Sequence, residues 1–402
     1  MDRLDNPYAP GAGMQPPELA GRDSLIEDAT IDMERILRGR PTRGVMLLGL
    51  RGVGKTVLLN RLYEISQTKG FQTIRIEAPE GGKLPELLVP ELRRVLHALD
   101  LKKAAGHKLR QAMGVLRNFI SAFKVSAGGI DISIEPTPGM ADTGNLQQDV
   151  PTLLVAVAEA AVEKNVAIGF FIDEIQYLSS DELASIIVAC HLVSQRSLPF
   201  YFVGAGLPQT AALAGQAKSY AERLFTYPEI GPLDPDSARL ALVKPAEQEG
   251  AHFAEEAVGK ILQLTERYPY FIQEWGHYVW DIAKASPISL ADVMQATPQV
   301  IIGLDKNFFR VRFDRLTTRE QKYLRAMAEL GQGPYRTGDI AEKLKIETSM
   351  IAPTRASLIK KGMVWSQRHG ETAFTAPMFE TFIIRQMPNL ETHTPKPKQK
   401  KG

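Results

Sequence analysis

Residues 49–56 read Gly-Leu-Arg-Gly-Val-Gly-Lys-Thr, which is the pattern G-x-x-x-x-G-K-[ST] of a phosphate-binding P-loop. Glycines let the backbone curl so that its N–H groups point at phosphate oxygens. In this pattern the lysine reaches the β- and γ-phosphates, and the Thr hydroxyl can ligate Mg²⁺. We therefore expect nucleotide contacts from Gly49, Leu50, Arg51, Gly52, Val53, Gly54, Lys55, Thr56 and Val57.

The segments on either side of this loop predict a strand and a helix. Val45–Leu48 is a short apolar run that suits a buried parallel strand. From Val57 to Lys69 the apolar residues follow helical spacing, and Gly70 stands where a helix C-cap belongs. A strand, a glycine loop and a helix N-terminus together make an anion site. An ordinary glycine-rich turn is the weaker interpretation.

A second motif lies about 115 residues downstream, in Gly169-Phe170-Phe171-Ile172-Asp173-Glu174. A buried strand that ends in two carboxylates has the form of a Walker B segment. Asp173 would hold Mg²⁺, and Glu174 would polarise the attacking water as a general base. Adjacent carboxylates at a strand end repel each other, and a bound cation is the natural compensation. The alternative is a helix N-terminus that carries acidic residues.

Further strands and helices complete an α/β pattern. We expect strands at 71–76, 167–172 and 198–203, a short one within 225–233, and a helix at 84–99. Strands that alternate with helices imply a parallel sheet with helices on both faces. From Asp234 to about Ile302 every predicted element is helical.

Residues 101–149 do not fit a minimal nucleotide-binding core. Residues 101–123 predict an amphipathic helix with a basic face, residues 124–135 a strand pair, and residues 136–149 a loop rich in Pro, Gly and Asp. One interpretation is an insert that contacts a protein or nucleic-acid partner. The other is a basic helix that packs on the core.

The C-terminal part predicts three helices and a hairpin, the order of a winged helix. Thr317-Thr318-Arg319-Glu320 is a capping box, and further helices follow at 337–344 and 348–361. The third helix would be a recognition helix with Thr354, Arg355, Ser357, Lys360 and Lys361, and the wing would present Gln367, Arg368 and His369. We expect DNA contacts from Ser349, Arg355, Lys360 and Arg368. Protein contacts are the alternative, because a fold does not fix a function.

Composition and charge agree with this division. The 402 residues carry a net charge of +2, and Phe313–Gly402 holds 16 Lys/Arg against 9 Asp/Glu, so this part is +7 and the remainder −5. A basic part on an acidic body points to nucleic acid. The tail that follows 390 ends in lysines and is expected to be disordered. The single cysteine, Cys190, and the lack of a membrane-length apolar run suggest a cytoplasmic protein.

With both Walker motifs and a helical segment after them, the chain resembles the AAA+ superfamily, and more narrowly the Orc1/Cdc6-like and STAND-type ATPases. The resemblance covers roughly residues 18–385. It implies five parts: an extended segment 1–20, an ATPase core 21–233, a helical lid 234–312, a winged helix 313–390 and a basic tail 391–402.

The resemblance also implies roles for three further residues. Arg22, after Gly21, matches the Gly-Arg box near the adenine; Arg223 lies where an arginine finger reaches a neighbouring subunit; and Pro269 matches a lid proline that touches the base. Their alternatives are a polar helix-capping turn, a surface pair of Arg223 with Glu222 or Glu229, and a core of aromatic residues around Pro269. One departure stands out: Gly204-Ala205-Gly206 lies where many relatives carry a polar sensor residue.

The leading hypothesis is an ATP-binding, Mg²⁺-dependent ATPase switch associated with duplex DNA, and a homo-oligomer is a further expectation. The alternative is a signalling scaffold that turns ATP over slowly and binds proteins through the winged helix and the insert. A metabolic kinase is disfavoured, because no acceptor pocket is evident and the Asp-Glu pair suits water as the nucleophile.

Overall fold

The computed structural model describes residues 1–11, 13–100, 106–126, 135–331, 333–366, 368 and 370–390. The chain divides into two compact units, each described by itself below. One comprises Gly21–Gly49 and Val53–Gly231, and the other Met1–Ala20, Leu50–Gly52 and Pro232–Gly402. Within the described ranges, no helix is long and apolar enough to cross a membrane.

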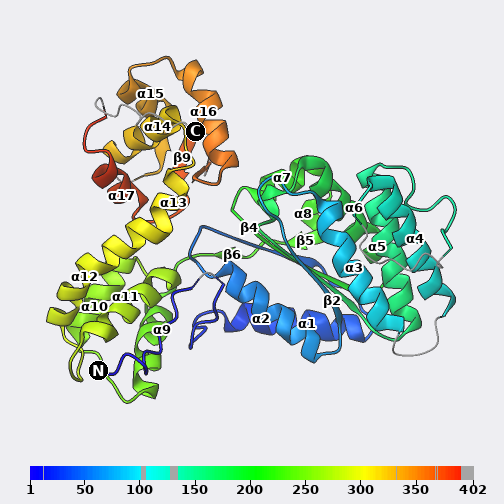
Figure 1. The fold of residues 1–402 in the computed structure, drawn as a ribbon, viewed down its shortest axis with the longest axis horizontal. Helices are drawn as coiled ribbons and strands as arrows, with labels where there is room; N and C mark the ends of the chain where they lie inside the picture. The colour runs from blue at the N-terminus through cyan, green and yellow to red at the C-terminus, as the bar shows by residue number, and fades with distance from the viewer. Residues whose placement is uncertain are drawn as a thin grey trace, which may run out of the picture. The chain divides into compact units, whose positions relative to one another are not determined.

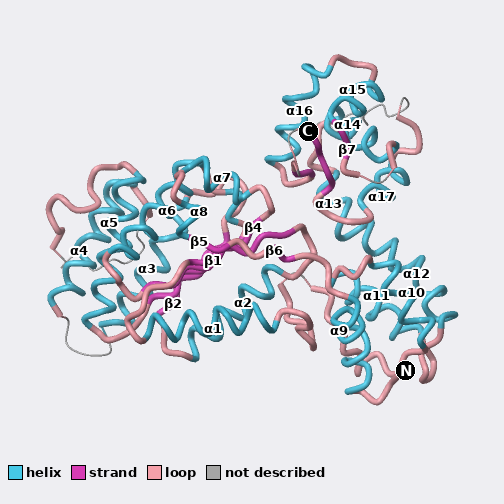
Figure 2. The backbone as a smooth tube through the Cα atoms, turned by 180° about the vertical axis from the view of Figure 1, so that it is seen from behind, coloured by secondary structure: helices cyan, strands magenta, loops and turns pink. Residues whose placement is uncertain are grey.

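The unit of residues 21–49 and 53–231 is built on a parallel sheet in the order β2-β3-β4-β1-β5, with β6 also paired to β1 (Figures 1 and 2). The strands are β1 (Gly44–Gly49), β2 (Gln72–Glu77), β3 (Ile168–Asp173), β4 (Phe200–Gly206), β5 (Phe225–Thr226) and β6 (Glu229–Ile230). The order places β4 between the strand that precedes the P-loop and the strand that ends in Asp173. All these strands run in the same direction, so their carboxyl ends meet at one edge.

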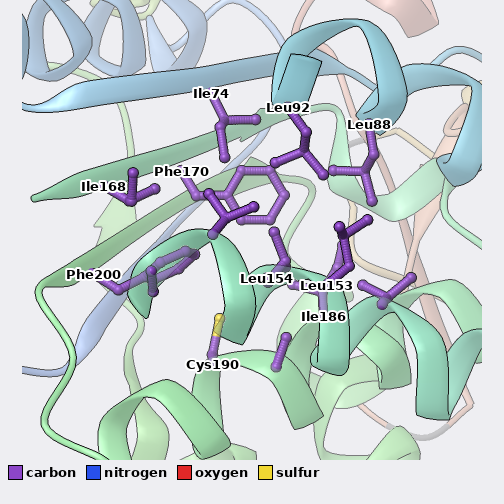
Figure 3. Close-up of a cluster of buried hydrophobic side chains, with 14 of the residues drawn as sticks. Ile74, Leu88, Leu92, Leu153, Leu154, Ile168, Phe170, Ile186, Cys190 and Phe200 are labelled. Carbon is purple, nitrogen blue, oxygen red and sulfur yellow. The ribbon is translucent and has the colours of Figure 1, made fainter. Parts of the chain in front are cut away.

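Helices cover both faces of this sheet, as the alternating sequence pattern predicts. The helical segments of this unit are α1 (Asp23–Leu37), α2 (Lys55–Thr68), α3 (Leu84–Asp100), α4 (His107–Phe123), α5 (Leu146–Glu163), η1 (Ile175–Tyr177), α6 (Ser180–Gln195), α7 (Thr210–Ala217) and α8 (Ala221–Leu224). On one face α1 and α2 pack on the sheet, while α3, α5 and α6 cover the other (Figure 1). Figure 3 shows that second face, where Phe170 of β3 is surrounded by Leu92, Leu154 and Ile186. Burying such side chains is the main favourable term in folding, at about 25 cal/mol per Å².

The predicted α/β elements are confirmed, and their limits shift by a few residues. The strand predicted over 198–203 begins at Phe200 and extends to Gly206, so the glycines lie inside it. The short strand expected within 225–233 is two strands, β5 and β6. The loop predicted over 136–149 ends earlier, because Asn145 caps α5 by accepting a hydrogen bond from the Gln147 N–H at 2.9 Å.

The segment that the sequence marks as an insert is part of the core where it is described. Helix α4 buries its apolar face, including Leu109, Val115 and Phe119, against α3 and α5. An ion pair between Lys108 and Glu159 at 2.6 Å ties it to α5. Residues 101–105 and 127–134, which carry part of the predicted helix and most of the predicted strand pair, lie outside the described residues.

The other unit contains the predicted all-helical segment. Its helices are α9 (Pro235–Gln248), α10 (Glu255–Thr265), α11 (Pro269–Ile282) and α12 (Leu290–Leu304), followed by the π-helical turn η2 (Asp305–Phe309) and α13 (Arg310–Phe313). The N-terminal segment packs on these helices. Tyr8 is buried, its hydroxyl donates to the Leu242 carbonyl at 2.5 Å, and its ring fills the space beside Gly276.

Residues 314–390 of the same unit form a small module of helices and short strands, hereafter the C-terminal module. It contains α14 (Thr318–Glu329), β7 (Tyr335–Arg336), α15 (Thr337–Leu344), α16 (Thr348–Lys360), β8 (Val364–Trp365), β9 (Glu371–Phe374) and α17 (Phe379–Gln386). The three predicted helices and the hairpin are all present, and the sheet order is β7-β9-β8. The sequence did not indicate β7 or α17. The tail from residue 391 lies outside the described residues.

Candidate nucleotide site

The P-loop backbone has the conformation that its glycines predict. Gly52 and Gly54 have φ angles of +81° and +91°, in the left-handed region that favours glycine. At Gly49 a Cβ atom would lie 2.2 Å from the Ile230 carbonyl oxygen, so β6 excludes any side chain there. Helix α2 begins at Lys55, and its N-terminal N–H groups therefore point toward the end of β1.

The two Walker motifs meet at the carboxyl edge of the sheet. Asp173 is the last residue of β3 and is 4% exposed, and its carboxyl interacts favourably with the Thr56 hydroxyl at the start of α2. Burial raises the pKa of the Asp173 carboxyl, while the hydrogen bonds from Thr56 and the Glu174 N–H and the charge of Lys55 act in the opposite direction. The residues predicted to share a metal are thus brought together.

These residues fit Mg²⁺. A divalent cation offsets the cost of burying the Asp173 charge, and Mg²⁺ is commonly held by one or two protein oxygens together with phosphates and water. Within the described ranges there is no group of three or more His, Cys, Asp or Glu side chains that could hold a metal by themselves. A site of one hydroxyl and one carboxylate therefore needs oxygens from the nucleotide.

Glu174 follows Asp173 in a strained conformation. Its φ is +50°, which is uncommon for a residue with a Cβ atom, and its N–H donates to Asp173 Oδ1 at 2.8 Å. Strain of this kind persists where surrounding contacts over-determine the backbone, and it is frequent at functional sites. The turn directs the chain from β3 into η1.

One residue of the site was missed by the sequence reasoning. Gln176, on η1, donates its amide N–H to Glu174 Oε2 and accepts the Leu207 N–H at 3.1 Å. The sequence signal that could have indicated Gln176 is the pair Gly204 and Gly206 in β4, because glycines leave space for a side chain from another element. Just beyond, Gln209 Oε1 and Thr210 Oγ1 are buried and have no hydrogen-bond partner among the described residues.

Arg22 lies at the P-loop, in the same unit. Its guanidinium donates to the Gly231 carbonyl at 2.6 Å and to the Val53 carbonyl at 3.3 Å. Arg22 is also the N-cap residue of α1, although its side chain makes no capping hydrogen bond there. A helix-capping turn, the alternative interpretation, therefore does not explain the position of the Arg22 guanidinium.

Pro269 is the first residue of α11, a position that proline favours. The next residue, Tyr270, belongs to the same unit as residues 50–52, and its N–H donates to the Gly52 carbonyl at 3.1 Å. Tyr270 also stacks on Phe308, with ring centroids 5.0 Å apart. The aromatic-core interpretation describes Tyr270, and the contact of Pro269 with a base stays a prediction.

Arg223 lies on the short helix α8 and is exposed. Within the described part of the chain it forms no ion pair with Glu222 or Glu229, which was the alternative to an arginine finger.

The predicted DNA-contacting residues divide into two groups. Ser349, Lys360 and Arg368 are exposed. Arg355 instead binds the hairpin: it donates to Thr372 Oγ1 at 2.8 Å and from Nη2 to Ser366 Oγ at 2.7 Å and the Glu371 carbonyl at 2.8 Å. Of the other predicted recognition-helix residues, Thr354 is buried, and Ser357 and Lys361 bind Glu320. Gln367 and His369 lie outside the described residues.

Comparisons with known proteins agree with this geometry. Residues 18–203 match the family of the AAA ATPase domain, and residues 306–383 match a domain of unknown function, DUF8462. No curated protein matches the sequence.

Among solved structures, a Walker-type ATPase of Pyrococcus abyssi is similar over 92% of this chain and 97% of its own, with 17% identity and a TM-score of 0.59. The Aeropyrum pernix Orc1 protein in complex with DNA matches over 93% and 94%, with 16% identity and a TM-score of 0.46. The Thermotoga maritima RuvB Holliday junction branch migration motor matches over 90% and 95%, with 15% identity and a TM-score of 0.44. Residues 18–203, with the P-loop and the Asp173–Glu174 strand end, are therefore the part of the chain that is similar to the AAA ATPase domain.

Proposed function

We propose that the protein is an ATP-binding switch that hydrolyses ATP to ADP and phosphate. The observation that carries this proposal is the interaction of the Thr56 hydroxyl at the start of α2 with the Asp173 carboxyl at the end of β3, which brings the two Walker motifs together, with Glu174 beside Asp173. A P-loop that only binds a nucleotide does not need a second carboxylate, such as Glu174, beside the metal ligand. A general base next to the metal ligand suits water as the nucleophile.

Each residue has a separate task in this reaction. Lys55 and the backbone N–H groups of the loop bind the phosphates, and Thr56 and Asp173 would hold Mg²⁺, which neutralises phosphate charge when bound. Glu174 accepts a proton from water as the water oxygen bonds to the γ-phosphorus. The bond from that phosphorus to the β–γ bridging oxygen breaks, and ADP leaves with the electron pair. Typical general-base contributions are about 10²–10⁴-fold in rate.

Three more residues are assigned by position. Arg22, whose guanidinium already binds the Val53 carbonyl, would contact the adenine side of the nucleotide, and Pro269 would touch the base from the lid. Arg223 would act across a subunit boundary in a homo-oligomer, and its exposure on α8 supports this. We assign the protein to the cytoplasm, which its single, buried cysteine favours.

Duplex DNA is the first candidate partner, bound by the C-terminal module acting as a winged helix. The net charge of +7 over Phe313–Gly402 and the exposed cations Lys360 and Arg368 support it. A different observation favours the alternative, a scaffold that turns ATP over slowly and binds a protein partner. The exposed positions of α16 are mostly small or uncharged, and they comprise Thr348, Ser349, Met350, Ala352, Pro353, Ala356 and Lys360.

The test of the nucleotide site is ATP affinity in the variant Lys55→Ala, measured by calorimetry with Mg²⁺. We expect binding to be lost, because the side chain that neutralises the β- and γ-phosphates is gone. Lys83→Ala is the matched control, since the Lys83 side chain is 75% exposed and its one ion pair is with Glu86. Unchanged affinity in Lys55→Ala contradicts the site.

The partner is tested by duplex binding at several salt concentrations. DNA binding through phosphates weakens steeply as salt rises, and removing one phosphate contact lowers the slope of log K against log salt by about 1. We therefore expect Lys360→Ala to weaken binding and flatten the slope. Absence of salt-sensitive binding to any duplex favours the protein-binding scaffold.

A further inference from the structure

The end of β4 is the part of the site that the assigned residues leave unexplained. β4 lies between β1 and β3, with Gly206 opposite Leu48 and Gly204 opposite Ile172. A polar side chain from this strand end would reach between the P-loop and Glu174. The strand carries Gly204-Ala205-Gly206 there instead.

The space beside these glycines is filled by side chains of η1 and of α7. A Cβ atom on Gly206 would lie 2.8 Å from Ile175 Cγ2, 3.0 Å from Gln176 Oε1 and 2.6 Å from Thr210 Oγ1. A Cβ atom on Gly204 would lie 3.2 Å from Ile175 Cδ1. A side chain at 206 therefore requires Ile175 or Thr210 to move, whereas one at 204 makes only a tight contact with Ile175.

Gln176 uses this space to connect Glu174 with β4. Leu207 offers a backbone N–H, which can only donate, and an ionised Glu174 carboxylate can only accept. These two partners fix the orientation of the Gln176 amide group. Its oxygen Oε1 accepts from the Leu207 N–H, and its nitrogen Nε2 donates to the Glu174 carboxylate. The carboxylate is thus held by a group that is itself anchored to the backbone of the sheet.

We propose that Gln176 is the positioning residue for the catalytic base: it holds the Glu174 carboxylate in the orientation that receives the proton from water. This inference rests on the proposed ATP hydrolysis at the same site. By occupying Oε2 of Glu174, the amide limits the rotation of a flexible side chain. A preorganised base loses less freedom on reaching the transition state.

The proposal predicts a separation between binding and turnover. Gln176→Leu removes both hydrogen bonds at similar volume, and we expect kcat for ATP to fall roughly 10- to 100-fold, the usual cost of removing an orienting partner. The KM and the dissociation constant for ATP should stay within about twofold, because Gln176 is not a P-loop residue. Gln195→Leu, an exposed position at the end of α6, is the matched control and should match the wild type.

A second variant distinguishes orientation of the base from support of the fold. Gln176→Glu keeps the shape and an acceptor for the Leu207 N–H but replaces the donor to Glu174 by a second carboxylate, which repels Glu174, so kcat should fall at least as far as in Gln176→Leu. In the background Glu174→Gln, Gln176→Leu should cause no further loss in single-turnover rate, because the two residues act as one unit.

Several results would overturn this role. They are a kcat of Gln176→Glu equal to or above wild type, or a loss that adds fully to that of Glu174→Gln. If Gln176→Leu fails to fold, Gln176→Glu decides the question. Absence of Mg²⁺-dependent hydrolysis in the wild type contradicts the proposed ATPase itself, whereas equal turnover in wild type and Gln176→Glu contradicts only the role of Gln176.

Discussion

Gly49 shows how a single residue can be required by packing and by ligand binding at once. It closes β1 and opens the P-loop, and β6 passes so near that a Cβ atom would meet the Ile230 carbonyl at 2.2 Å. The pattern G-x-x-x-x-G-K-[ST] is usually explained by the path of the loop around phosphate. In this chain the first glycine is also demanded by the neighbouring strand.

We predict that Gly49→Ala lowers the free energy of unfolding by about 1–3 kcal/mol, the usual cost of overpacking a close contact. Urea denaturation measures it. Gly231→Ala is the control, because a Cβ atom there meets nothing within 4 Å and the φ angle is ordinary. Equal midpoints for the two variants would show that β6 tolerates a side chain at position 49.

The residues of the nucleotide site differ in how far the sequence predicts them. Lys55, Thr56, Asp173 and Glu174 stand in motifs whose spacing reflects the chemistry directly. Gln176 does not, because its role depends on the N–H of Leu207, the residue directly after β4, and no local pattern encodes which strands are neighbours.

At the scale of elements, Glu320 illustrates a capping group with a second set of partners. The Thr317 hydroxyl accepts the Glu320 N–H, and the Glu320 carboxylate accepts the Thr317 N–H at 2.7 Å, as the capping box predicts. The carboxylate also accepts from Ser357 at 2.7 Å and Lys361 at 2.8 Å, which ties α14 to α16. Burial opposes ionisation, but these hydrogen bonds outweigh it and lower the pKa of Glu320 from 4.5 to about 2.

This lowered pKa gives the C-terminal module a defined acid sensitivity. A carboxyl whose pKa is lower in the folded state stabilises the fold fully above about pH 4.5, and the stabilisation is lost as the pH falls toward 2. We predict that Glu320→Gln costs about 2 kcal/mol at pH 7 and that its difference from wild type shrinks below pH 4.5. Denaturation of the full chain from pH 7 to 3 tests this, and a constant difference contradicts it.

The limits of helices that begin or end at local capping residues were predicted well. The limits of elements that form only by pairing with a distant strand were predicted poorly. The helix at 337–344 has the predicted limits, and Thr317 caps α14 as expected. By contrast, β7 has two residues and exists only because it pairs with β9. Arg355 follows the same rule, since its basic character suggests DNA, while its three hydrogen bonds to the hairpin arise from packing.

At the scale of the whole molecule, Arg223 links turnover to assembly. If it completes a neighbouring subunit's site, Arg223→Ala and Glu174→Gln should each be inactive alone. Mixing them should restore part of the activity, because some interfaces then combine an intact Glu174 with an intact Arg223. Arginine fingers contribute about 10³–10⁵ in rate. ATPase assays of the separate and mixed variants measure this, and a mixture no more active than its components contradicts action between subunits.

The most direct measurement for the whole account is Mg²⁺-dependent ATP hydrolysis in the wild type and in Glu174→Gln, with ATP affinity determined for both. We predict that the wild type releases phosphate and that Glu174→Gln binds ATP equally well while its turnover falls by about 10²–10⁴-fold. Unchanged hydrolysis in Glu174→Gln, or a wild type that binds ATP without ever releasing phosphate, would contradict the assignment of this site as a hydrolytic one.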